Sequence, residues 1–102
     1  MDTIWHLTLD GTPARLGDEG FVHASLTRQL AGTLEVHFAG VDRIVLLRLD
    51  PEALGDALVF EPSRGGDDFP HVYRELTDVD VLERRELTRA PGGAFDLSAL
   101  PD

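Results

Sequence analysis

Two short segments of the chain place a hydroxyl group two residues after an imidazole. His6 is followed by Thr8 and His23 by Ser25, with an apolar residue after each position. On a β-strand, residues i and i+2 face the same way, so each pair would point to one side. An imidazole beside a hydroxyl can hydrogen-bond a ribose or phosphate oxygen. Both segments therefore predict contacts with one ligand. The alternatives are chance repetition and, for Ser25, a helix-capping role.

A second group of reactive side chains lies in the segment 60–73. It contains the carboxylate of Glu61, the guanidinium of Arg64, the imidazole of His71 and the phenol of Tyr73, with a glycine pair after the arginine. Glycine backbone N–H groups can approach an anion closely, and an arginine provides a permanent positive partner. The segment predicts an anion site. The alternative is a surface loop in which Arg64 pairs with one of the aspartates that follow it.

The chain has four histidines, each of which taken alone is more often a structural residue than a functional one. His6, His23 and His71 fall in or beside expected strands, whereas His37 precedes Phe38 on an expected helix, off its apolar stripe. We therefore predict that the first three converge on one cleft and that His37 lies outside it. With an ordinary pKa of about 6.5, an imidazole suits acid–base chemistry near neutrality.

The elements that must position these residues follow from apolar periodicity. Short strands are expected at residues 4–9, 21–24, 43–49, 58–61, 71–73 and 79–82. Apolar residues at a spacing of four predict one main helix that is capped by Ser25 or Thr27 and stops at Gly40. Asp50 and Gly55 bracket a single further helical turn. The expected fold class is α+β: a small single domain of short mixed or antiparallel strands with one main helix.

Length and charge exclude several classes of protein. The 102 residues allow one domain, expected over residues 1–87, with a tail at 88–102 that is ordered only if Phe95 and Leu97 dock on the core. Nine basic residues, all Arg, against nineteen acidic ones give a net charge of −10, which argues against bulk nucleic-acid binding. The absence of cysteine excludes disulfides and thiolate metal sites.

The apolar runs are also too short to cross a membrane, so no membrane association is expected. The longest, at residues 44–47, is far below the roughly 20 residues that a membrane span requires. The first residues do not resemble a secretory signal, so a cytoplasmic location is expected. The oligomeric state stays open.

Several motifs together resemble those of a known family. Residues 20–25, 44–47, 61–66 and 69–73 are similar in type, order and spacing to the motifs of the bacterial and plant family called domain of unknown function 952 (DUF952). The likeness runs from about residue 4 to residue 87. That family in turn resembles, more distantly, the ADP-ribosyltransferase superfamily. The resemblance therefore implies an ADP-ribosyltransferase-like fold.

The more distant resemblance also implies roles for individual residues. The stretch from Trp5 to Thr8 looks like the first-strand His-x-Thr motif that contacts the nicotinamide ribose and amide of NAD. His23 would lie near the nicotinamide, and His71 stands roughly where the transferases carry their catalytic glutamate, with Glu61 as the nearby carboxylate that could substitute. The expected catalytic residues are His23, His71 and Glu61, and the expected cofactor-binding residues are His6, Thr8, Ser25, Arg64 and Tyr73.

The function implied is the binding of NAD, ADP-ribose or a related phosphate-bearing, nucleotide-like small molecule, extending to a transferase reaction with NAD as cofactor. One alternative is a non-catalytic acidic interaction module with structural histidines, which predicts no cleft containing three imidazoles. Another is a three-histidine metal-dependent hydrolase, although the chain lacks a compact ligand motif. A phosphodiesterase with two His-x-hydroxyl motifs is disfavoured, since His6 and His23 are only 17 positions apart.

Overall fold

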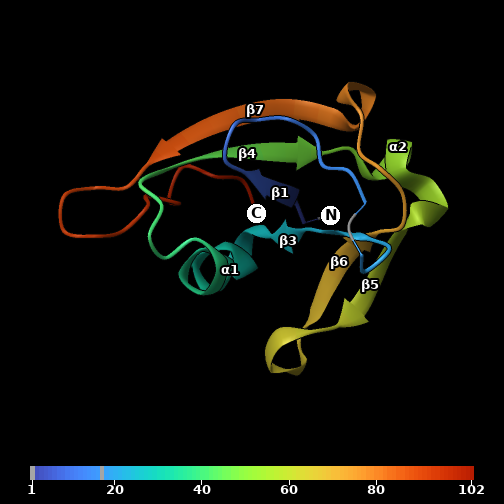
Figure 1. The fold of residues 1–102 in the computed structure, drawn as a ribbon, viewed down its shortest axis with the longest axis horizontal. Helices are drawn as coiled ribbons and strands as arrows, with labels where there is room; N and C mark the ends of the chain where they lie inside the picture. Colours follow the sequence, from blue (N-terminus) through green and yellow to red (C-terminus); the bar gives the residue numbers. More distant parts are fainter. Residues whose placement is uncertain (1, 17) are drawn as a thin grey trace.

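The computed structural model describes residues 2–16 and 18–102, and within them seven strands pair into two antiparallel sheets (Figure 1). The strands are β1 (Ile4–Thr8), β2 (Val22–His23), β3 (Ser25–Leu26), β4 (Arg43–Leu49), β5 (Leu58–Pro62), β6 (Asp68–Val72) and β7 (Val81–Thr88). The helices are α1 (Leu30–His37) and α2 (Pro51–Leu54), and 3-10 turns lie at Thr27–Gln29, Gly55–Ala57, Arg64–Gly66 and Asp78–Asp80. The expected α+β class is confirmed, with antiparallel pairing in every described strand pair. No helix in this part of the chain is long and apolar enough to cross a membrane.

One sheet has four strands in the order β3-β1-β4-β7, and the other has three in the order β2-β6-β5. β4 is central, as its sequence predicts, and its residues 44–47 are all buried. β2 and β3 belong to different sheets although only Ala24 separates them. The backbone N–H of Ala24 donates to the carbonyl of Pro70 in β6, which keeps the two sheets adjacent at this point.

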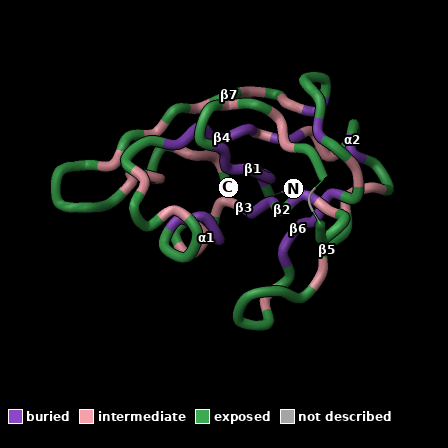
Figure 2. The backbone as a smooth tube through the Cα atoms, viewed as in Figure 1, coloured by how far each residue is buried: buried purple, intermediate pink, exposed green. Residues whose placement is uncertain are grey.

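Apolar side chains form two clusters, because β1 and β4 bury side chains on both faces of the four-stranded sheet. Figure 2 shows the buried stretches of these strands in purple. Along β1, Trp5 and Leu7 point towards α1, while Ile4 points towards the second sheet. The cluster under α1 contains Trp5, Leu7, Leu30, Leu34, Ile44 and Leu46. The cluster between the sheets contains Ile4, Val22, Ala24, Leu26, Val45, Leu47, Leu49, Leu54, Val72 and Leu76.

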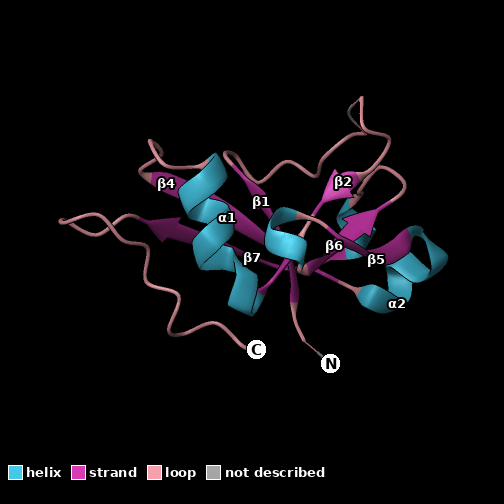
Figure 3. Ribbon diagram, turned by 90° about the horizontal axis from the view of Figure 1, so that it is seen from below, coloured by secondary structure: helices cyan, strands magenta, loops and turns pink. Residues whose placement is uncertain are grey.

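The segment after β7 returns across the molecule and ends beside the start of β1 (Figure 3). Phe95 and Leu97 pack against the cluster under α1, together with Leu100. The backbone N–H of Thr3 donates to the carbonyl of Asp102 at 2.7 Å. The tail therefore covers part of the core and satisfies the backbone N–H of Thr3, directly before β1.

Several element boundaries differ from the sequence-based expectation. The main helix starts with a 3-10 turn, and neither expected cap is right, because Ser25 lies in β3 and Thr27 lies inside the turn. The side chain of Gln29 instead accepts a hydrogen bond from the backbone N–H of Leu26 at 2.9 Å. β6 begins at Asp68, three residues before the expected strand, because the sheet accommodates Pro70 at a position where proline usually argues against a strand. β7 starts after a 3-10 turn and runs to Thr88, six residues beyond the expected end at Leu82.

The 3-10 turn before β7 is held by a buried carboxylate, Asp80. Both of its oxygens accept hydrogen bonds from Arg74, at 2.7 and 2.8 Å, and the backbone N–H of Thr77 donates to it at 2.8 Å. The hydrogen bonds from Arg74 are the main reason that the pKa of Asp80 falls from 3.8 to about 2. Because the folded-state pKa lies below the unfolded value, the ionised carboxylate stabilises the fold above pH 4.

We predict that Asp80→Ala lowers the free energy of unfolding by about 3 kcal/mol, since it leaves the guanidinium of Arg74 without its buried partner. The matched control is Asp78→Ala, which removes an exposed ion pair with Arg84 and should cost little. Denaturant titration from pH 7 down to pH 2 measures both effects. Wild-type stability should fall as the pH drops from about 4 towards 2, and Asp80→Ala should lose this part of the decline. Equal effects of the two variants would contradict the structural role given to Asp80.

Candidate functional site

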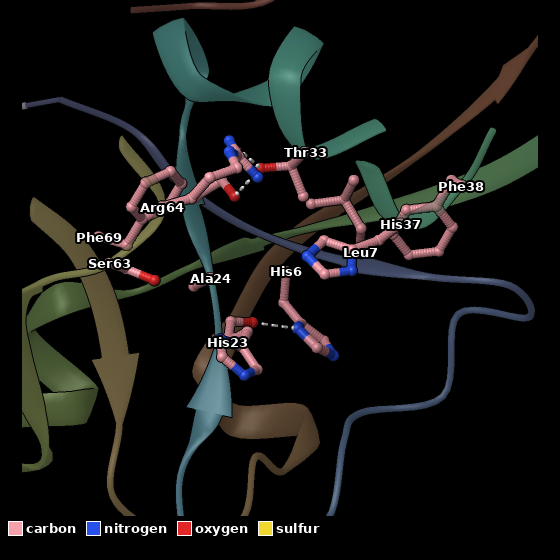
Figure 4. Close-up of a pocket in the computed structure, with 11 residues that line it drawn as sticks. His6, Leu7, His23, Ala24, Thr33, His37, Phe38, Ser63, Arg64 and Phe69 are labelled. Atoms are coloured by element: carbon pink, nitrogen blue, oxygen red, sulfur yellow. Dashed lines mark hydrogen bonds between the residues drawn. The ribbon is translucent and has the colours of Figure 1, made fainter. Parts of the chain in front are cut away.

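A cavity of about 260 Å³ opens between α1, β1 and the hairpin that joins β5 to β6 (Figure 4). Its polar lining consists of His6, His23, Ser25, Thr33, His37, Ser63 and Arg64. Its apolar lining consists of Leu7, Ala24, Phe38 and Phe69. The cavity thus offers imidazoles, hydroxyls and a guanidinium over an apolar floor, which is a composition typical of small-molecule sites.

Strand alternation in the segment 22–26 explains why two of these side chains reach the cavity. Val22, Ala24 and Leu26 are buried in the cluster between the sheets. The intervening side chains, His23 and Ser25, therefore point away from that cluster. Both line the cavity.

His6 is half-buried in β1 and has a defined tautomer. Its Nδ1 lies 2.7 Å from the backbone carbonyl oxygen of His23. A carbonyl can only accept, so Nδ1 carries the proton and donates it. Burial lowers the pKa of His6 below its ordinary value of 6.5, and this outweighs the hydrogen bond, which raises it. At neutral pH the imidazole is uncharged, and its Nε2 is an acceptor without a hydrogen-bond partner among residues 2–16 and 18–102.

A chain of side-chain hydrogen bonds connects Ser25 to Arg64 through Thr33. The Oγ atoms of Ser25 and Thr33 lie 2.9 Å apart, and the hydroxyl of Thr33 is 3.1 Å from the carbonyl of Gln29. Nη2 of Arg64 donates to the Thr33 hydroxyl at 3.3 Å. The guanidinium also lies over the ring of Phe69, 4.8 Å from its centroid. These contacts hold the Arg64 head group at the cavity wall (Figure 4).

No carboxylate among the described residues forms an ion pair with Arg64. Asp67, three residues along the same loop, binds Arg28 at 2.8 Å and accepts a further hydrogen bond from Gln29. The hydrogen bond from Arg28 is the main cause of a pKa of about 2 for Asp67. The reading of this loop as an ion pair between Arg64 and a following aspartate is therefore wrong. The positive charge of Arg64 is left to the cavity.

A separate cluster lies beside the cavity on one face of the three-stranded sheet. It consists of Glu61, His71 and Tyr73. Oε1 of Glu61 accepts hydrogen bonds from Nδ1 of His71 at 2.8 Å and from the phenol of Tyr73 at 2.5 Å. The ring of Phe21 stacks on His71 with centroids 4.1 Å apart. His23 connects this cluster to the cavity, since its ring meets the ring of His71 edge-on at 5.4 Å.

Comparison with known proteins identifies the family. The family described as protein of unknown function DUF952 matches residues 6–84. The chain belongs to the DUF952 family. No curated protein matches the sequence.

Solved structures of one bacterial relative share the fold of this DUF952 protein. The crystal structure of protein CC0527 from Caulobacter crescentus has 29% sequence identity and a TM-score of 0.80, covering 93% of this chain and 94% of that one. The solution NMR structure of the same protein has 30% identity and a TM-score of 0.75, covering 91% and 90%. Neither match names an ADP-ribosyltransferase, so that more distant resemblance stays a proposal.

Of the expected site residues of the DUF952 protein, four line the cavity: His6, His23, Ser25 and Arg64. Glu61, His71 and Tyr73 lie together in the neighbouring cluster instead. The hydroxyl of Thr8 is buried, where it donates to the carbonyl of Val45 and accepts from the backbone N–H of Gly11. It closes the turn after β1 and is not free for a ligand.

His37, expected outside the site, lines the cavity. It is exposed, as its place off the apolar stripe predicts, and it lies at the rim of α1 where the cavity separates this helix from His6 of β1. Thr33, four residues before His37, also lines the cavity and is not among the expected site residues. Residues i and i+4 share a helix face, so the pair Thr33 and His37 was a readable signal of a polar stripe facing a site.

The metal alternative is not supported. Among residues 2–16 and 18–102, no group of three or more His, Cys, Asp or Glu side chains is arranged to hold a metal ion. The interaction-module alternative predicted no cleft with three imidazoles. The cavity contains those of His6, His23 and His37.

We predict that His6 titrates below pH 6.5, because burial disfavours its charged form. As the pH falls, His6 of the unfolded chain is protonated before His6 of the folded chain. The free energy of unfolding that depends on neutral His6 is therefore present in full above pH 6.5 and declines below it. Imidazole C–H resonances followed by NMR from pH 8 to pH 4 measure the pKa, and His6→Gln assigns the signal. A midpoint at or above 6.5 would disprove a desolvated, neutral His6.

Proposed function

We propose that this protein binds a phosphate-bearing, nucleotide-like small molecule in the cavity, with NAD and ADP-ribose as the ligands that the distant resemblance suggests. A volume of about 260 Å³ is just below the usual range of about 300 to 1,000 Å³ for ligand sites. This size favours the seating of one nucleotide-sized part of a dinucleotide. The remainder of such a ligand would extend into solvent.

The observation that carries the proposal is the guanidinium of Arg64. It is held at the cavity wall by Thr33 and Phe69, and its loop's own Asp67 is occupied by Arg28. Arginine binds phosphate through charge-assisted hydrogen bonds of fixed geometry. A cavity that keeps an arginine in place without a carboxylate partner suits an anionic group of a ligand.

The imidazole of His6 favours a transferase reaction as a second step. It is uncharged at neutral pH, and its Nε2 has no intramolecular hydrogen-bond partner among the described residues. An uncharged imidazole in a ligand site can take a proton from an attacking hydroxyl group. The proposed order is binding of NAD through Arg64, bond formation between the hydroxyl oxygen and the ribose carbon that carries nicotinamide, departure of nicotinamide with the electron pair of the broken bond, and acceptance of the hydroxyl proton by His6.

We predict that Arg64→Ala weakens the binding of AMP and ADP-ribose at least tenfold. Charge-assisted hydrogen bonds contribute about 1.5 to 3 kcal/mol, and each 1.4 kcal/mol is a factor of ten in affinity. Isothermal titration calorimetry gives the dissociation constants, and thermal shift at millimolar AMP, ADP-ribose and NAD shows whether each ligand stabilises the fold.

Arg84→Ala is the matched control, because Arg84 is an exposed arginine, paired with Asp78, that does not line the cavity. It should bind the ligands like the wild type. An equal loss of affinity in the two variants would mean that only the overall charge of the protein matters. The absence of a thermal shift with all three ligands would overturn the proposed function. Stabilisation by zinc alone would favour metal binding instead.

A further inference from the structure

His71 is a buried histidine with one ring nitrogen unused. The residue is 5% exposed, and its Nε2 is the buried side-chain polar atom that finds no hydrogen-bond partner in the described part of the chain. Leaving such an atom unpaired costs free energy, so native proteins rarely do it without a reason. The contacts of the opposite nitrogen indicate what the unused one can do.

Glu61 fixes the orientation and tautomer of this imidazole. The hydrogen bonds from Tyr73 and His71 lower the pKa of Glu61, so that its carboxyl group is ionised at neutral pH and can only accept. In neutral His71 the proton therefore lies on Nδ1, which donates to Glu61 at 2.8 Å. Nε2 is left with a lone pair, so it is an acceptor that waits for a donor.

Phe21 covers the cluster on one side. Its ring stacks on His71 at an interplanar angle of 23° and lies 5.4 Å from the ring of Tyr73. Phe21 is itself only half-buried and follows Gly20, whose φ of 80° belongs to the left-handed region. The cover is thus a side chain at the surface and not part of the packed core.

The cluster borders the proposed ligand cavity. His23 lines the cavity and touches the ring of His71, and Phe69 lines it two residues before His71 on the same face of β6. Ser63, in the cavity lining, likewise follows Glu61 by two residues. A ligand held at Arg64 therefore has the His71 cluster beside it along one sheet face.

We propose that Nε2 of His71 accepts a hydrogen bond from a ribose hydroxyl of the bound ligand when the ring of Phe21 turns aside. This inference rests on the proposed nucleotide binding and adds the group that recognises the sugar. His71 contacts the ligand, while Glu61 is a positioning residue that, in the neutral imidazole, holds the proton on Nδ1 and so leaves the lone pair on Nε2. The 64–66 turn would thus bind the phosphate, and β6 would bind the sugar.

The test compares AMP with 2′,3′-dideoxy-AMP, which has the same base and phosphate but neither ribose hydroxyl. The wild type should bind AMP several-fold to about tenfold more tightly. His71→Phe preserves an aromatic ring under Phe21, and it should bind both nucleotides with the affinity that the wild type has for the dideoxy compound. Arg64→Ala should weaken both nucleotides and leave their ratio unchanged.

Two further measurements keep the inference testable if His71→Phe does not fold. Glu61→Ala removes the acceptor that holds the Nδ1 proton of His71 and should reduce the preference for AMP, whereas Glu75→Ala removes an exposed carboxylate outside the cluster and should retain it. The ¹⁵N resonance of His71 Nε2 should shift on addition of AMP and stay in place with the dideoxy compound.

Equal affinity for the two nucleotides, with binding still dependent on Arg64, would overturn the sugar contact alone. Failure of both nucleotides to bind would overturn the proposed function and this inference with it.

Discussion

The segment from Val22 to Leu26 passes from one sheet to the other while every second side chain stays in the same core cluster. Val22 and Leu26 lie in different sheets, yet both pack between them together with Ala24. Because of this shared burial, His23 and Ser25 are displayed on the opposite side, next to α1 and β1. The carbonyl of His23 then orients the ring of His6. The site is thus a consequence of how the two sheets are joined.

Charge is distributed so that one arginine remains available to a ligand. The chain as a whole is strongly acidic, and cross-strand ion pairs such as Arg43 with Glu86 and Arg48 with Glu83 use arginines to hold β7 against β4. Beside the cavity, Arg28 neutralises Asp67, the first carboxylate that follows Arg64 in the sequence. A net charge of −10 repels a polyanion over a long range, but it does not prevent a single, well-placed guanidinium from binding a small anion at contact.

The parts of the fold that the sequence predicts well are those with local signals. The apolar run of β4 and the helical turn that Asp50 caps are read directly, and Asp50 does accept a hydrogen bond from the backbone N–H of Glu52. The sequence predicts β7 too short because its four consecutive charged residues, 83–86, show no apolar alternation, although they lie on an edge strand whose pairing with β4 continues through them. Its pairing with β4 is a tertiary feature that no local pattern reports.

The candidate site can be only partly predicted from the sequence, because it too depends on tertiary packing. Alternation places His6 and His23 on strand faces correctly, but whether a face meets a cavity depends on what packs against it. Thr8 shares a strand with His6 and yet serves the turn at Gly11, since the chain reverses directly after it. His37 was assigned to open surface, although α1 lies against β1 at that point. Position along an element is a local property, and access to a ligand is a property of the assembled layers.

The two oriented histidines have one feature in common that defines what the site can recognise. In His6 a backbone carbonyl holds the Nδ1 proton, and in His71 a carboxylate does so. Each imidazole in its neutral form therefore presents Nε2 as an acceptor, so these rings favour hydroxyl or amide donors over anions. Arg64, at the other end of the cavity lining, presents only donors and a positive charge. A molecule that satisfies both ends carries an anionic group and hydroxyl groups a few bonds apart, which is the chemistry of a sugar phosphate.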